Sequence, residues 1–142
     1  MNVSARTEYA CIAVLELAAN YGAAKPMRIR DIAEANGIPS RFLVQILLQL
    51  KAAGIVGSTR GAAGGYQLIR PPDELTLAEV MAVGDGQAQD PESNAAKQTV
   101  ATQTLLNVWR TAAAVQRRSF ESITFADLVE QVRGETQSMY YI

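Results

Sequence analysis

Arginine, glutamine and serine side chains that suit nucleic-acid recognition recur between residues 28 and 66. Arg41 and Gln45 can each form paired hydrogen bonds with a base edge, arginine with guanine and glutamine with adenine. Hydroxyl and guanidinium groups in the same stretch can bind phosphate oxygens. These residue types make a candidate surface for double-stranded DNA, which we assign to Arg28, Ser40, Arg41, Gln45, Ser58, Arg60, Gly64 and Tyr66.

The composition argues against an enzyme. The chain has no histidine and a single cysteine, Cys11. Most nucleophilic and zinc-dependent reactions use an imidazole to activate the nucleophile or to hold the metal. The sequence also has no paired-carboxylate or phosphate-loop motif. It therefore predicts a protein that is not an enzyme and that holds no metal or cofactor.

Charge is distributed unevenly along the chain, although the total is only −1. Residues 1–72 contain eight basic and four acidic side chains, a net charge of +4, whereas residues 73–142 contain five basic and ten acidic side chains, a net charge of −5. This asymmetry predicts a basic binding surface in the first half, with the acidic half turned away from a polyanion. The apolar stretches are too short to span a bilayer and the first residues lack a signal-peptide pattern, so we expect a cytoplasmic protein without membrane contact.

A helix-turn-helix pattern places the first group of candidate residues. Apolar spacing predicts a helix over 31–36, a turn at Gly37 and a second helix over 40–53. Ala33 is small enough for two helices to approach closely, and Leu43 can fill the space between them. Ser40, Arg41, Val44 and Gln45 then lie away from the expected core face. Two helices around a glycine turn also occur in ordinary helical bundles, so this segment alone leaves simple packing open.

A predicted β-hairpin follows directly. Residues 55–60 and 66–70 have strand character and are joined by the glycine-rich stretch 61–65. Arg60 and Arg70 place basic groups on or beside this ribbon. A helix-turn-helix followed by a basic hairpin is typical of a winged helix, and the remaining alternative is a winged-helix module whose main partner is a protein. Upstream, the alternating segment Met27–Arg30 favours a further short strand.

The second half is expected to be helical. Thr76 caps a helix that ends near residues 84–86, residues 87–98 are polar and predict a loop, and Thr124 caps a last helix. Between them, residues 99–122 predict a helix about 35 Å long, too long for a small core to cover. Its apolar stripe is the candidate dimer interface and consists of Leu105, Val108, Trp109, Ala112, Val115 and Phe120. The fold class is therefore mainly α with a small β-hairpin, with a winged helix-turn-helix domain over 1–85, a variable loop over 86–98, and a dimerisation helix and C-terminal helix over 99–142.

These motifs, in this order, resemble the Rrf2 family of bacterial transcriptional regulators. The most specific match is the wing Arg60-Gly61-Ala62-Ala63-Gly64-Gly65-Tyr66, and the stretches 38–43, 50–56 and 123–128 agree as well. The resemblance implies an N-terminal winged helix and a homodimer that binds an inverted-repeat operator, usually to repress transcription. The apolar stripe would then be covered by the same helix of a second subunit.

Two departures from the family refine these expectations. Members with an iron–sulphur cluster resemble one another in three cysteines between the winged helix and the dimerisation helix, and residues 86–104 contain none. Cys11 lies among apolar residues, where we expect a buried structural thiol. The chain therefore resembles the cluster-free branch. Val44 stands where relatives often carry an acidic residue, so we do not assign the operator sequence of those relatives to this chain. For the signal, a small-molecule effector and a regulatory protein partner both remain open.

Overall fold

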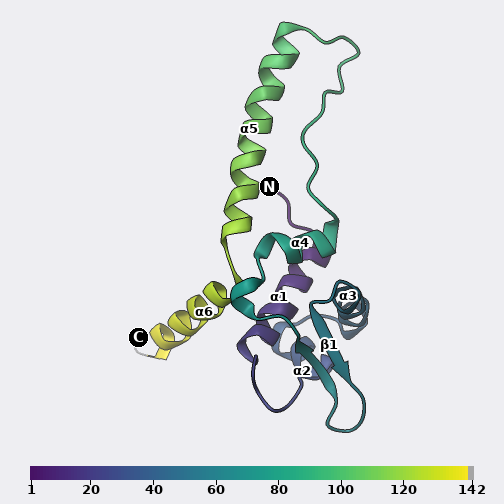
Figure 1. Ribbon diagram of the computed structural model, residues 1–142, viewed down its shortest axis with the longest axis vertical. Coiled ribbons are helices and arrows are strands. Elements are labelled where there is room, and N and C mark those ends of the chain that lie inside the picture. Colours follow the sequence, from purple (N-terminus) through teal and green to yellow (C-terminus); the bar gives the residue numbers. More distant parts are fainter. Residues whose placement is uncertain (141–142) are drawn as a thin grey trace.

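The computed structural model of the chain describes residues 1–140 and consists of six α-helices, one short 3-10 helix and a two-stranded antiparallel sheet. The other α-helices pack around α1 (Ala5–Ala19), except α5 (Val100–Ser122), which extends away from them (Figure 1). The predicted fold class is confirmed: the molecule is mainly α, with a winged helix-turn-helix and a long additional helix.

Helix α1 (Ala5–Ala19) runs through the centre of the core. It begins at Ser4, whose Oγ accepts a hydrogen bond from the Thr7 backbone N–H at 3.1 Å. Its inner face is apolar, and burial of this face against the other helices is the main source of stability in a fold of this kind. The fully buried side chains include Val14, Leu17, Ile32, Leu43, Leu47, Leu50, Leu75, Val80 and Phe125.

The helix-turn-helix consists of α2 (Ile29–Asn36) and α3 (Ser40–Ala52). Gly37 joins them with a φ of +64°, and the Ile38 N–H donates to the Ala33 carbonyl oxygen at 3.0 Å. Ala33 is only 4 % exposed and Leu43 is fully buried, so the predicted packing at this turn is confirmed. Glycine suits the turn because its φ lies in the left-handed region, which L side chains rarely adopt.

The start of α2 differs from the expectation. Arg28 is in an extended conformation and caps the helix, with its carbonyl accepting from the Asp31 N–H at 3.1 Å, so the helix already includes Ile29. The predicted strand over Met27–Arg30 is therefore wrong. Only Met27 pairs with the sheet, through a single bridge to Tyr66.

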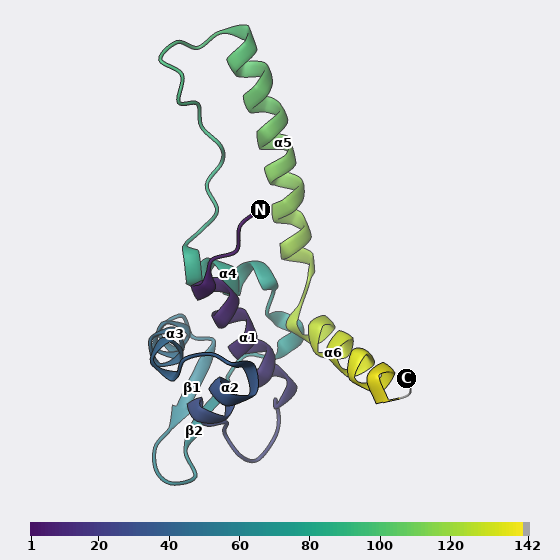
Figure 2. The ribbon, with the colours of Figure 1, turned by 180° about the vertical axis from the view of Figure 1, so that it is seen from behind.

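The wing is formed by β1 (Val56–Thr59) and β2 (Gly65–Leu68), paired in register from Val56 opposite Leu68 to Thr59 opposite Gly65. Val56 and Leu68 are buried at its base. The other end of the hairpin is exposed and projects at the opposite end of the molecule from the free end of α5 (Figure 2). The wing is thus anchored in the core while its tip remains accessible.

A 3-10 helix, η1 (Pro72–Glu74), leads from the wing into α4 (Leu77–Asp85). Thr76 caps α4 by accepting from the Glu79 N–H at 3.2 Å, as predicted. The Glu79 carboxylate pairs with the Arg70 guanidinium at 2.5 Å, which lowers the pKa of Glu79 below its ordinary value. Arg70 was expected to add positive charge beside the wing, but this ion pair neutralises it.

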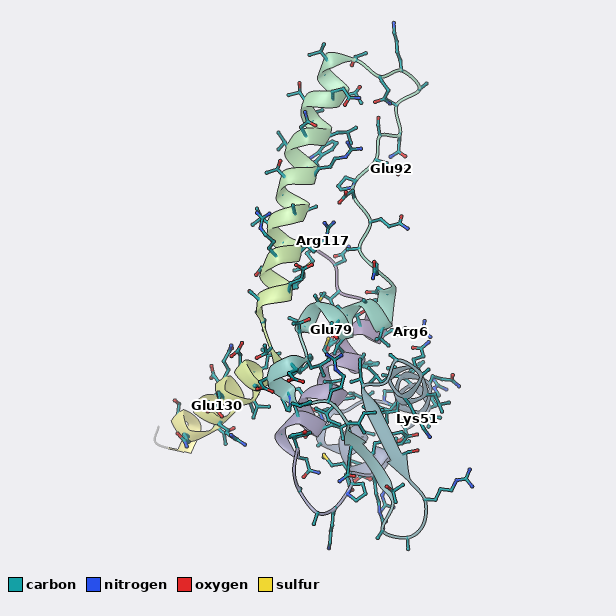
Figure 3. The ribbon with its side chains drawn as sticks, in the orientation of Figure 1. Arg6, Lys51, Glu79, Glu92, Arg117 and Glu130 are labelled. Carbon is teal, nitrogen blue, oxygen red and sulfur yellow. The ribbon has the colours of Figure 1, made fainter. Side chains whose placement is uncertain are left out.

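Helix α5 (Val100–Ser122) is reached through residues 86–99, which run alongside it (Figures 1 and 2). This loop is fastened by Arg110 Nε, which donates to the Pro91 carbonyl at 3.1 Å, and by an Arg117–Asp90 ion pair at 2.7 Å. Arg117 is labelled on α5 in Figure 3. Across residues 1–140, no helix combines the length and hydropathy needed to cross a membrane.

Helix α6 (Phe125–Tyr140) returns to the core. Thr124 and Asp127 form a reciprocal capping box, in which each backbone N–H donates to the other residue's side chain at 3.1 Å. Phe125 is fully buried and Val129 is 6 % exposed, and both belong to the core cluster that surrounds α1. Within the C-terminal segment, α6 therefore packs in the same core as the winged helix.

Candidate nucleic-acid interface

The recognition surface on α3 is its solvent-exposed side. Ser40, Arg41 and Gln45 are all exposed, while the opposite side of the helix supplies Leu43 and Ile46 to the core. The Arg41 guanidinium carbon lies 5.0 Å from the centroid of the Phe42 ring, close enough for a cation–π contact that limits its orientations. All three polar residues that the sequence assigned to this helix are thus accessible to a ligand.

The five candidate residues outside α3 lie together. A shallow depression of about 560 Å³ between the wing and the start of α2 is lined in part by Arg28, Ser58, Arg60, Gly64 and Tyr66. Arg28 donates a hydrogen bond to the Ala62 carbonyl and so connects α2 to the wing tip. Arg60 is exposed and forms no salt bridge within residues 1–140, which leaves its charge available for a phosphate.

Gly64 and Tyr66 shape the wing from within. Gly64 is buried, and a Cβ atom added there would lie 2.2 Å from the Thr59 carbonyl oxygen. Tyr66 is half-buried and exchanges two backbone hydrogen bonds with Met27, of 2.7 and 2.9 Å. Gly64 is therefore required because no side chain fits at this position of the wing, and it is not accessible to DNA.

Lys51 connects the two parts of the surface. Its Nζ donates to the Ser58 Oγ at 2.7 Å, joining the last turn of α3 to β1. Lys51 is not among the residues that the sequence assigned to the DNA surface, although its basic side chain in the last turn of α3 was a usable signal. Lys51 lies on the side of α3 and the wing, whereas Glu130 lies on α6 at the other side of the molecule (Figure 3).

The candidate dimer stripe on α5 is largely exposed. Val108 is 61 %, Trp109 52 % and Val115 54 % exposed. Leu105 and Ala112 are exposed as well. Phe120 differs, because it is half-buried and lines a cavity of about 660 Å³ between α4, the 86–89 segment and α5. Five of the six predicted residues thus form an uncovered apolar surface in the single chain.

The residues present do not fit an iron–sulphur cluster. Such clusters are held mainly by cysteine thiolates, and Cys11 is the one cysteine in the sequence. Within residues 1–140, no three histidine, cysteine or acidic side chains are grouped so that they could hold a metal ion. The segment 86–104, which would have to supply the cysteines, contains none.

Cys11 is half-buried against the core on α1. Burial, and to a smaller extent the negative charge of Asp85, raise the pKa of its thiol to about 11. Asp85 itself accepts hydrogen bonds from the Thr7 and Ser4 hydroxyls, which lower the pKa of its carboxyl. The thiol is therefore protonated at neutral pH.

The rate at which the Cys11 thiol is alkylated should show that it is protonated. The thiolate is the reactive form, and a pKa about two units above the ordinary value of 9.0 reduces its fraction at pH 8 roughly 100-fold. We expect native protein to react with iodoacetamide at least that much more slowly than protein unfolded in urea, with mass spectrometry as the measurement. Equal rates in the two states would show that Cys11 is accessible and that its pKa is not raised.

The fold and this surface define a class of protein: a winged helix-turn-helix transcription regulator. Residues 3–131 match the Rrf2 family, described as an iron-dependent transcriptional regulator, and the chain belongs to this family. Its residues nevertheless depart from that description, because the cysteines of a cluster are missing.

Individual relatives agree with this assignment. The HTH-type transcriptional regulator CymR of Bacillus subtilis is 29 % identical over the full length of both chains. A Mycobacterium tuberculosis protein described as an HTH-type transcriptional regulator, Rv1287, is 37 % identical over 90 % of this chain and 81 % of its own. Among solved structures, CymR, the global cysteine regulator of B. subtilis, has a TM-score of 0.80 at 28 % identity, covering 92 % of this chain and 98 % of its own. IscR of T. potens has a TM-score of 0.74 at 29 % identity, covering 93 % and 88 %.

Proposed function

We propose that this transcriptional regulator is a sequence-specific repressor that binds an inverted-repeat operator as a homodimer and needs no iron–sulphur cluster. The observation that carries this proposal is the pairing of an exposed polar surface on α3 with a wing whose Arg60 is unpaired within the described chain. In a sequence-specific DNA complex, base-edge contacts specify the sequence and phosphate contacts position the protein, and α3 and the wing offer side chains for both.

The dimer is supported by the surface of α5. Leu105, Val108, Trp109 and Val115 are each more than half exposed, and they recur at helical spacing along one stripe. An apolar stripe of this kind is costly in water, and a second copy of the same helix would cover it. A two-fold dimer presents two recognition helices and therefore requires two half-sites related by the same symmetry.

The proposal is tested by selection from a random duplex library with protein purified in air, followed by binding to the enriched duplex at several salt concentrations. Enrichment of an inverted repeat would support an operator-binding dimer that works without a cluster. Transcription in vitro from a promoter containing that repeat should then decrease when the protein is added. Absence of any enriched sequence would favour the alternative, a winged-helix module whose main partner is a protein.

Arg60→Ala should weaken binding to the operator and to unrelated duplexes alike. If Arg60 contacts one phosphate in each half-site, its loss should reduce the slope of log K against log salt by about one for each subunit. The matched control is Arg133→Ala, which removes the same charge from α6, where Arg133 is 60 % exposed and pairs with Glu130. If Arg60→Ala leaves the affinity and the salt slope unchanged, Arg60 does not contact DNA.

A further inference from the structure

Two large apolar side chains lie within the exposed surface of α3. Val44 is 39 % and Leu48 is 51 % exposed, although both belong to the helix that also supplies four residues to the core. With Arg41 and Gln45 they follow the i, i+3, i+4, i+7 spacing that places side chains on one side of a helix. The recognition surface therefore contains an apolar strip between its hydrogen-bonding groups.

Nothing in the structural role of α3 requires these two side chains to be apolar. They are absent from the core cluster and from the partly buried residues packed against it. Phe42 differs, because its ring centroid lies 6.3 Å from that of Tyr9 and it also contacts Arg41. Val44 and Leu48 are thus the large apolar side chains of α3 that remain for an external ligand.

The surrounding charges indicate which ligand covers them. Arg41 and Lys51 lie on the same helix, and no salt bridge within residues 1–140 neutralises either one. An apolar protein partner would have to bury these cations, whereas a DNA duplex supplies phosphates for them. In the major groove, the thymine C5-methyl is the apolar group that a base edge presents to such side chains.

We propose that Val44 and Leu48 contact thymine methyl groups in each operator half-site, beside the base edges contacted by Arg41 and Gln45. This inference rests on the proposed function and adds a chemical requirement for the operator. Four residues of helix rise separate the two side chains by about 6 Å along the axis, which corresponds to about two base steps. The methyl groups they contact should therefore lie within a few bases of each other.

Deoxyuridine substitution tests the contact without changing base pairing, because it removes only the methyl group. Each thymine of the enriched operator is replaced in turn by deoxyuridine in one half-site, and the dissociation constant is measured. Burial of one methyl is worth about 0.8 kcal/mol, so we expect about fourfold weaker binding at one or two positions and little change at the others.

The same duplexes are then measured with Val44→Ala and Leu48→Ala, after thermal melting has shown that each variant is folded. At its own thymine, each variant should bind the thymine and deoxyuridine duplexes with equal affinity, because the contact is already lost. The matched control is Val132→Ala on α6, where the side chain is 46 % exposed, and it should retain the fourfold difference.

The outcomes separate this inference from the proposed function. If the protein binds its operator but every deoxyuridine duplex binds as tightly as the parent, the methyl contacts are excluded and the operator-binding function stands. A deoxyuridine effect that persists in both alanine variants would assign the methyl to another residue or to duplex flexibility, and would also overturn the inference. If no duplex is enriched in the first place, both proposals fail.

Discussion

Val108→Glu should convert the proposed dimer into monomers and remove high-affinity operator binding. Val108 is 61 % exposed in the single chain and lies at the middle of the α5 stripe, so the substitution leaves the folded subunit almost untouched. In the dimer, however, it would bury two carboxylates without partners, at about 3 kcal/mol or more for each. Association should therefore weaken by a factor on the order of ten thousand or more.

Light scattering coupled to size-exclusion chromatography gives the mass, and titration of the enriched operator gives the affinity. The control is Asn107→Glu, an equal charge change at an exposed α5 position outside the stripe, which should remain dimeric. A Val108→Glu protein that keeps the mass of a dimer would show that another surface joins the subunits. A wild-type protein that is monomeric at micromolar concentration would overturn the dimer itself.

Gly64→Ala should disrupt the wing while leaving the helices in place. The added Cβ would lie 2.2 Å from the Thr59 carbonyl oxygen and 2.9 Å from the carbonyl carbon of Arg60. Both contacts are with backbone, so the hairpin must open to relieve them. Forced overpacking of this kind costs about 2 kcal/mol or more, and the displaced Arg28 and Arg60 should reduce operator affinity at least tenfold.

Urea unfolding followed by far-ultraviolet circular dichroism measures the stability, and operator titration measures the affinity. Gly134→Ala on α6 is the matched glycine-to-alanine control, because a Cβ there meets no atom within 4 Å. Alanine favours a helix interior over glycine by up to about 1 kcal/mol, so this control should be slightly more stable than the parent and bind DNA equally well. A Gly64→Ala protein with unchanged stability and affinity would show that the wing adapts without cost.

Local chemistry made much of the molecule predictable. The turn at Gly37, the caps at Thr76 and Thr124 and the hairpin between residues 55 and 70 depend on residues near one another in sequence, so short patterns identify them. The same is true of the exposed positions on α3, because helical periodicity places Arg41 and Gln45 opposite Leu43 and Leu47, while Ser40 is exposed as the first residue of the helix.

Tertiary contacts decided what local patterns could not. Alternation over Met27–Arg30 resembles a strand, but a pairing partner exists only for Met27, and the Arg28 carbonyl begins a helix instead. Arg70 carries a charge in the sequence, yet Glu79, nine residues away, neutralises it. The sequence by itself determined most of the elements and identified candidate side chains for contact with DNA. Burial, ion pairing and backbone clearance depend on segments that are distant in the sequence. Only the structure could therefore show that Gly64 leaves no room for a Cβ atom, that Arg60 forms no salt bridge within residues 1–140, and that α6 packs in the core.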